Sequence, residues 1–291
     1  INSKIKECIM VNQGFFGNIS NTIHLMKSCV NVLKKDKELV FFPIMAAIFV
    51  IVLLGIIYST GGITFSDNPE EQGSIIPLAI LIFGANFIIV FFNSALISAA
   101  LERLRGGDPN ISSGLSHAFK HVHHIFLWSI IVTIMALIFA AIRSSGRNRG
   151  MMGQIMTELF ASFLQAGWAM MTFFVVPIIV SENLGPISAI KRSSGLFKQT
   201  WGNQVAANFG FGIFQILALL ASGAIGWIFG LASPTFGMIV GVLCASISVS
   251  IIYTLEGIYK AALYEFAMGE KPLEFEQQDL RTAYRASASM A

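Results

Sequence analysis

Residues 39–58 read LVFFPIMAAIFVIVLLGIIY and contain no charged side chain. An α-helix needs about 20 consecutive apolar residues to cross the hydrocarbon core of a bilayer. This stretch therefore predicts a transmembrane helix, and it belongs to 28 uncharged residues between Glu38 and Asp67. Strands of a membrane barrel would instead alternate apolar and polar residues over segments of about 10 residues. The sequence therefore predicts an all-α integral membrane protein.

Four more stretches of the chain are uncharged. They hold 30 residues between Glu71 and Glu102, 22 between Lys120 and Arg143, 23 between Glu158 and Glu182, and 57 between Lys198 and Glu256. The last is too long for one helix and fits two, joined where Ser233-Pro234-Thr235 interrupts the apolar pattern. We therefore expect six transmembrane helices in a single membrane domain over residues 1–291.

The composition excludes several classes of protein. Hydrophobic residues make up 55% of the chain and charged residues only 12%, against about 25% charged in an average soluble domain. Such a chain cannot cover a water-facing surface, which excludes a soluble enzyme, a disordered protein and a nucleic-acid binder. Three cysteines cannot form a disulfide framework, so we interpret Cys8, Cys29 and Cys244 as free thiols.

The positions of lysine and arginine predict the orientation in the membrane. With six helices, 16 of the 19 basic residues fall on one side when Lys260 is counted there. By the positive-inside rule that side is cytoplasmic, and it carries both termini. The three exceptions are Arg143, Arg147 and Arg149, which fall on the outer side.

The cytoplasmic segments indicate a threefold repeat of helical hairpins. The segments before helices one, three and five are amphipathic, which predicts three cytoplasmic interfacial helices. They end in the pairs Leu33-Lys34, Phe119-Lys120 and Phe197-Lys198. The repeat units cover about 15–109, 110–186 and 187–272, and a polar cytoplasmic tail covers 273–291. Polar linkers of similar composition in any six-span protein are the alternative explanation.

The ends of the even-numbered helices also match one another. The spacing from Glu102 to Gly106 and Pro109 equals the spacing from Glu265 to Gly269 and Pro272. Fewer residues separate Glu182 from Gly185-Pro186. Acidic residues at the membrane ends of spans could bind protons or ions. Our preferred interpretation is that they cap the turns or pair with the arginines and lysines of the next loop.

These motifs resemble a known bacterial superfamily. The matching residues are Val176-Pro177-Ile178-Ile179-Val180-Ser181-Glu182-Asn183-Leu184-Gly185-Pro186, Ala189-Ile190-Lys191-Arg192-Ser193, Leu196-Phe197-Lys198, and Leu101-Glu102-Arg103-Leu104-Arg105-Gly106-Gly107-Asp108-Pro109. The superfamily comprises uncharacterised six-span inner-membrane proteins similar to the membrane-anchor domain of glycerophosphoryl diester phosphodiesterases. The resemblance covers about Ile19 to Pro272 and implies the fold and a location in the bacterial inner membrane. The tail after Pro272 is too short to hold the phosphodiesterase domain, so the resemblance does not imply its activity.

Several basic residues at the membrane edges are candidates for binding lipid headgroups. They are Lys34, Lys35, Lys120, Arg143, Arg147, Arg149 and Lys198. For the outer arginines a solvated loop explains the sequence equally well.

Four amide side chains interrupt the apolar helices, namely Asn86, Asn93, Gln165 and Gln215. Such residues usually form hydrogen bonds between helices. A polar path across the membrane is the alternative interpretation.

Three histidines share one face of the second amphipathic segment. His117, His121 and His124 follow helical spacing, and an i, i+4 histidine pair can chelate zinc or copper. No cysteine or carboxylate stands at ligand spacing beside them, so we prefer a histidine face at the level of the lipid headgroups and predict no metal or cofactor.

The function predicted from the sequence is non-enzymatic. No catalytic motif is present, whereas amphipathic segments, apolar spans and few mid-membrane charges fit a protein that organises lipid or partners. The small-residue pairs Gly226/Gly230 and Gly237/Gly241 in spans five and six predict a homo-oligomer. A channel or transporter for a small solute or lipid is the alternative.

Overall fold

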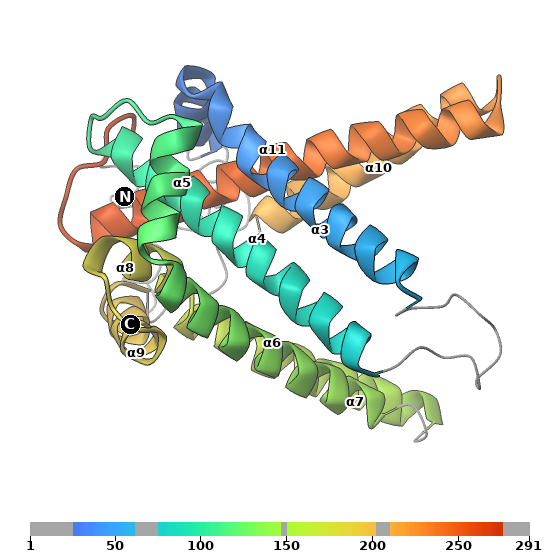
Figure 1. Ribbon diagram of the computed structural model, residues 1–291, viewed down its shortest axis with the longest axis horizontal. Helices are drawn as coiled ribbons and strands as arrows, with labels where there is room; N and C mark the ends of the chain where they lie inside the picture. Colours follow the sequence, from blue (N-terminus) through green and yellow to red (C-terminus); the bar gives the residue numbers. More distant parts are fainter. Residues whose placement is uncertain (1–25, 62–74, 147–149, 202–209, 276–291) are drawn as a thin grey trace, which may run out of the picture. The chain divides into compact units, whose positions relative to one another are not determined.

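The computed structural model describes residues 26–61, 75–146, 150–201 and 210–275, and Figure 1 shows these ranges in colour as helices joined by short connections. No strand occurs within them. The chain divides into two compact units. The hairpin unit contains the described parts of Ile1–Val40, Ala100–Asn110 and Gln199–Ala291, and the bundle unit contains those of Phe41–Ala99 and Ile111–Lys198.

Five helical segments are long and apolar enough to cross a membrane. They are Lys37–Ser59, Ile76–Leu104, Val122–Ser144, Gly150–Glu182 and Pro234–Ala267. In α10 (Gly210–Gly230) the described apolar stretch, Phe214–Gly230, is shorter and is not one of the five. The prediction of an all-α protein with membrane-length helices is therefore confirmed for the described residues.

Aromatic side chains join the long helices of the bundle unit. Between α3 (Phe41–Ser59) and α4 (Ile75–Leu104), the rings of Phe49 and Phe92 lie 5.4 Å apart. On α6 (Val122–Ser144), Phe126 contacts Phe83 of α4 edge to face with the ring centres 5.4 Å apart. Such offset and edge-on ring pairs stabilise packing beyond the apolar area that they bury. The outward faces stay apolar, as Ile51 of α3, 66% exposed, shows.

The fourth predicted span is broken into two helices. After α7 (Gly150–Met171) the chain turns at residues 172–174 and continues as α8 (Val175–Glu182). Pro177 has no N–H to donate, and a proline ring clashes with the carbonyl group four residues earlier. The buried N–H of Phe174 instead donates to Oγ of Ser193 at 3.0 Å. Ser193 lies on α9 (Pro186–Trp201), so α9 supplies the partner that the broken helix lacks.

Two short helices of the bundle unit have one buried face each. In α5 (Ile111–Lys120) the buried residues are Gly114 and Ala118, four positions apart. In α9 they include Ala189, Ser193 and Leu196, again at helical spacing. The opposite faces carry exposed polar and charged residues, among them His117, Lys120, Lys191 and Arg192.

The hairpin unit contains a helix over residues 26–35, the 3-10 helix η1 (Lys37–Val40), the end of α4, α10 and α11 (Pro234–Ala267). With 34 residues, α11 is about 51 Å long at 1.5 Å per residue. From Thr254 to Glu265 most of its side chains are buried, whereas apolar residues nearer Pro234, such as Met238 and Val242, are exposed.

Glycines let α10 and α11 approach closely as an antiparallel hairpin (Figure 1). The turn falls at Ser233-Pro234, where the sequence predicts the break. A Cβ atom at Gly226 would lie 2.8 Å from the Cα atom of Gly241, and one at Gly237 would lie 2.5 Å from the carbonyl oxygen of Gly226. The small-residue faces of these two helices therefore contact each other within this chain.

The ends of α4 and α11 have the same backbone geometry. Gly106 (φ 90°) and Gly269 (φ 87°) both adopt the left-handed conformation that glycine favours. At each end the residue after the glycine donates its N–H to the carbonyl oxygen of the glutamate, from Gly107 to Glu102 at 2.9 Å and from Glu270 to Glu265 at 3.0 Å. This is the hydrogen bond of a Schellman cap. The equal Glu–Gly–Pro spacing in the sequence thus corresponds to equal local structure.

Candidate functional site

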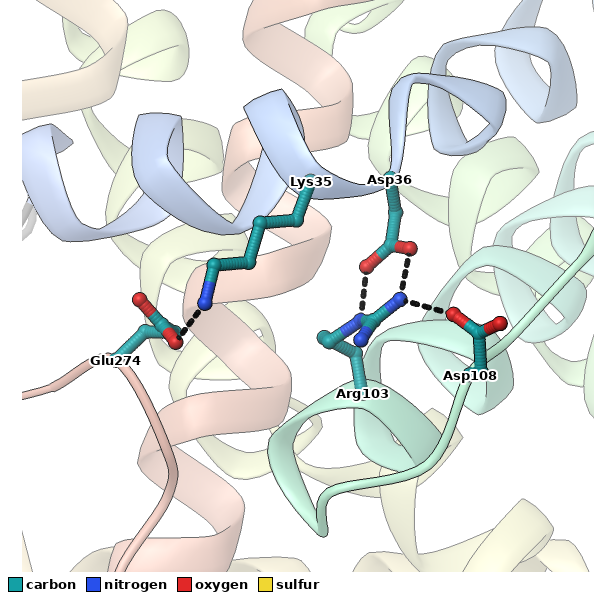
Figure 2. Close-up of polar contacts among 5 residues, drawn as sticks. All are labelled: Lys35, Asp36, Arg103, Asp108 and Glu274. Atoms are coloured by element: carbon teal, nitrogen blue, oxygen red, sulfur yellow. Dashed lines mark hydrogen bonds and ion pairs between the residues drawn. The ribbon is translucent and has the colours of Figure 1, made fainter.

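A network of ion pairs surrounds the end of α4 in the hairpin unit (Figure 2). Arg103 donates hydrogen bonds from Nε and Nη2 to the two carboxylate oxygens of Asp36, and Nη2 also lies 2.6 Å from Oδ1 of Asp108. The side chain of Asp36 is 6% exposed, whereas that of Asp108 is 96% exposed. A two-pronged arginine–carboxylate pair is stronger and more directional than a single contact. It ties the residue between helix 26–35 and η1 to the end of α4.

Two further ion pairs extend the network. Arg105 donates to Oε1 of Glu265 from Nη2 at 2.7 Å and from Nε at 3.1 Å. The Glu265 side chain is only 4% exposed, so Arg105 compensates a buried charge at the end of α11. Lys35 lies 2.5 Å from Glu274, as Figure 2 shows. The end of α4 is therefore held to the segment before α3 and to the end of α11.

Sequence reasoning found only part of this network. It predicted that glutamates at the ends of even-numbered helices cap the turns or pair with basic residues of the next loop, and Glu182 with Arg192 (3.4 Å) is such a pair. Glu265 pairs instead with Arg105 at the end of α4. It did not single out Asp36 or Arg103. The available signal was that Asp36 is the one acidic residue within a run of lysines, Lys34-Lys35-Asp36-Lys37.

A second polar cluster lies between α6 and α7 in the bundle unit. Arg143 Nε lies 3.2 Å from each carboxylate oxygen of Glu158, and its Nη2 donates to Oε1 of Gln165 at 2.6 Å. Ser162 Oγ lies 3.4 Å from Oε1 of Glu158. From the sequence, Arg143 is a candidate for binding lipid headgroups and Gln165 is an amide within a span. The structure brings these two side chains into contact.

The position of Glu158 corrects the expected helix boundary. We expected this span between Glu158 and Glu182, but α7 already begins at Gly150. Glu158 therefore lies inside the helix, where its pairing with Arg143 lowers the cost of a charge on an apolar helix. An open hollow of about 590 Å³ lies here, lined by Arg143, Gln154, Ile155, Glu158 and Leu159.

The other predicted headgroup-binding residues lie on different elements. Lys34, Lys35 and Lys120 are exposed. Arg147 and Arg149 lie outside the described residues, and the side chain of Lys198 does as well.

The four predicted span amides are not joined to one another by hydrogen bonds in the described residues. Asn86 donates to the carbonyl oxygen of Ile82 within α4 at 3.0 Å, and Gln165 binds Arg143. Asn93 is half-buried on α4. On α10, Nε2 of Gln215 is buried without a hydrogen-bond partner among the described residues.

The histidines pair by ring contacts. The rings of His117 and His121 stack with centres 6.0 Å apart, and Nδ1 of His121 lies 2.9 Å from the carbonyl oxygen of His117. His123 and His124 have ring centres 3.9 Å apart. Throughout the described ranges no three histidine, cysteine or acidic side chains come together as metal ligands, so His117, His121 and His124 do not assemble such a site there.

Two of the three cysteines lie in described segments, and both are free thiols. Cys29 on helix 26–35 is completely buried, and this burial raises the pKa of its thiol well above the usual range because it disfavours the thiolate. Cys244 is half-exposed on α11, and Cys8 lies outside the described residues.

Apolar helices of membrane length, with ion pairs at their ends, define the chain as a helical membrane protein. It belongs to a family of unknown function, DUF6159, whose profile matches residues 74–272. The match begins just before α4 and ends at the proline after α11, so it includes both polar clusters apart from Lys35, Asp36 and Glu274. None of the curated proteins matches this chain. The membership agrees with the predicted uncharacterised family, while similarity to the phosphodiesterase membrane anchor stays a prediction.

Proposed function

We propose that this protein is a non-enzymatic, homo-oligomeric protein of the bacterial inner membrane that organises lipid or partner proteins. One observation carries the proposal: the spans expose apolar side chains along their length, whereas the ion pairs with buried carboxylates lie at helix ends. Ile51 on α3, Phe163 on α7 and Trp227 on α10 are 66%, 76% and 71% exposed. Arg105–Glu265 and Arg103–Asp36 lie where α4 ends.

The proposal includes six spans in three related hairpins. With 21 residues, α10 is about 31 Å long, close to the hydrocarbon thickness of about 30 Å, and supplies the sixth span. The matching caps at Gly106 and Gly269 support the repeat. The one-sided burial of α5 and α9 supports their role as interfacial helices, and the loop charges favour cytoplasmic termini.

Self-association is proposed to use the exposed apolar faces of α10 and α11. Their glycines already contact each other within the chain, so contacts with another copy would use the other faces. These carry Leu220 and Trp227 on α10 and Met238 and Val242 on α11, all more than half exposed.

Reconstitution of the full chain into lipid nanodiscs and liposomes tests this function. We expect a particle mass of two or more copies per nanodisc and no increase in the flux of small solutes across liposomes. A monomer that conducts solute would overturn the proposal. A Leu220→Ala, Val242→Ala variant is expected to shift the mass towards monomer, while a matched variant on α3, Ile51→Ala, keeps the oligomer.

A channel or transporter is the second candidate function. The break between α7 and α8 favours it, because transporters bind solutes at broken helices. Independently, Nε2 of Gln215 on α10 is buried without a hydrogen-bond partner among the described residues. The same liposome experiment decides: solute flux that Gln215→Leu abolishes would favour transport over the scaffold function.

A further inference from the structure

The hollow beside Arg143 lies about one hydrocarbon thickness from the histidines at the other end of α6. From His124 to Arg143 the helix rises about 28 Å at 1.5 Å per residue. The hydrocarbon core of a bilayer is about 30 Å thick. When α6 spans the membrane, the hollow therefore lies at the depth of the lipid headgroups on the surface opposite the histidines.

Two parallel stripes run along α7 from this hollow. The polar stripe contains Gln154, Glu158 and Ser162, spaced four residues apart. The apolar stripe beside it contains Ile155, Leu159 and Phe163, which are 44%, 62% and 76% exposed. Ile155 and Leu159 also line the hollow, so its polar wall continues directly into a surface that suits acyl chains.

Among its described lining residues the hollow presents one cation and one anion, both open to a ligand. The Arg143 side chain is 37% exposed and that of Glu158 is 57% exposed. The contacts of Arg143 within the described residues use Nε and Nη2, so the two N–H groups of Nη1 remain for an acceptor. A zwitterion that carries a phosphate and a protonated amine complements this pair without separating it, whereas an anionic headgroup meets the Glu158 charge.

We propose that the hollow binds an aminophospholipid of the phosphatidylethanolamine class. The lipid phosphate accepts from Nη1 of Arg143, the ammonium donates to the carboxylate of Glu158, and the acyl chains lie along Leu159 and Phe163. This inference rests on the proposed lipid-organising function and specifies the headgroup that it selects.

Native mass spectrometry of the delipidated full chain tests the site. The protein is titrated with an equimolar mixture of phosphatidylethanolamine, phosphatidylcholine and phosphatidylglycerol in mild detergent. We expect phosphatidylethanolamine to be retained about three- to fivefold over each competitor, the size of one exposed ion pair. Phosphatidylcholine keeps the positive charge but has no ammonium N–H donors, and phosphatidylglycerol has no cation.

Substitutions assign the selectivity to the two side chains. Glu158→Gln is expected to remove the preference over phosphatidylglycerol while phospholipid is still retained, and Arg143→Gln to lower the retention of all three. Glu182→Gln is the matched control, because Glu182 forms a partly exposed ion pair with Arg192 elsewhere in the same unit. It should leave the preference unchanged.

Three results would overturn the inference: equal retention of the three lipids by the wild type, a preference that survives Glu158→Gln, or loss of the preference in Glu182→Gln. Displacement of the lipid by free phosphoethanolamine would assign the hollow to a soluble ligand and would also overturn it. The particle mass and the solute flux test the proposed function separately, so a protein that forms oligomers without lipid preference would refute only this inference.

Discussion

Arg103 holds Asp36 with two hydrogen bonds, from Nε and Nη2 to the two carboxylate oxygens. Asp36→Asn removes the charge of the aspartate. The Arg103 side chain, which is 20% exposed, then keeps the exposed Asp108 as its charged partner. We expect Asp36→Asn to lower the free energy of unfolding by about 2–3 kcal/mol, below the full cost of breaking a buried pair because Asp108 remains. Unfolding titrations in mild detergent measure it. Asp108→Asn is the control, and an equal loss in both variants would contradict a special role for Asp36.

Gly237 requires the absence of a side chain. A Cβ atom there would lie 2.5 Å from the carbonyl oxygen of Gly226 and closer still to the backbone of Gly230. Gly237→Ala is therefore expected to separate α10 from α11 and to destabilise the protein by about 1–3 kcal/mol through overpacking. Gly223→Ala is the control, since no atom lies within 4 Å of its added Cβ. Similar melting temperatures for the two variants would show that the hairpin is looser than described.

Ser193 accepts the N–H of Phe174 where the fourth span breaks. Ser193→Ala removes the hydroxyl that accepts from this buried donor, which costs about 1–3 kcal/mol. Ser188→Ala, on the exposed side of the same helix, should have little effect. Thermal unfolding in detergent compares the two variants, and an unchanged transition in Ser193→Ala would mean that the break finds another acceptor.

The proposed topology predicts opposite labelling of the two ends of α6. In a cysteine-free background, Ser116→Cys on α5 should react with a membrane-impermeant maleimide only after the cells are opened. Ser145→Cys, just after α6, should react in intact spheroplasts. Both positions are exposed, so access depends on the side of the membrane. Labelling of Ser116→Cys from outside would reverse the orientation.

Local patterns in the sequence predicted the helices and the pairing of Glu182 with the next loop. Uncharged runs locate the spans, and Ser233-Pro234 marks the hairpin turn because proline begins a helix but cannot continue one. The Glu–Gly–Pro spacing indicated the caps at Gly106 and Gly269, since a Schellman cap is set by neighbouring residues alone.

Contacts between distant residues were less predictable. Glu158 suggested a helix boundary because a single charge looks incompatible with a span, and only the pairing across to Arg143 explains its place inside α7. Asp36 looked like one more polar residue among lysines. Its burial follows from Arg103, which lies 67 positions further along the chain.

The burial pattern of α11 determines how this helix responds to a sideways force. Its buried base, from Thr254 to Glu265, is about 16 Å long, while the exposed arm from Pro234 to Thr254 is about 30 Å long. A rod anchored at one end is a cantilever, so a sideways force on the arm becomes a torque at the base. Because the glycines join α10 to the arm, both helices bend as one beam. The torque acts on the buried side chains of the base, among them Glu265 in its ion pair with Arg105.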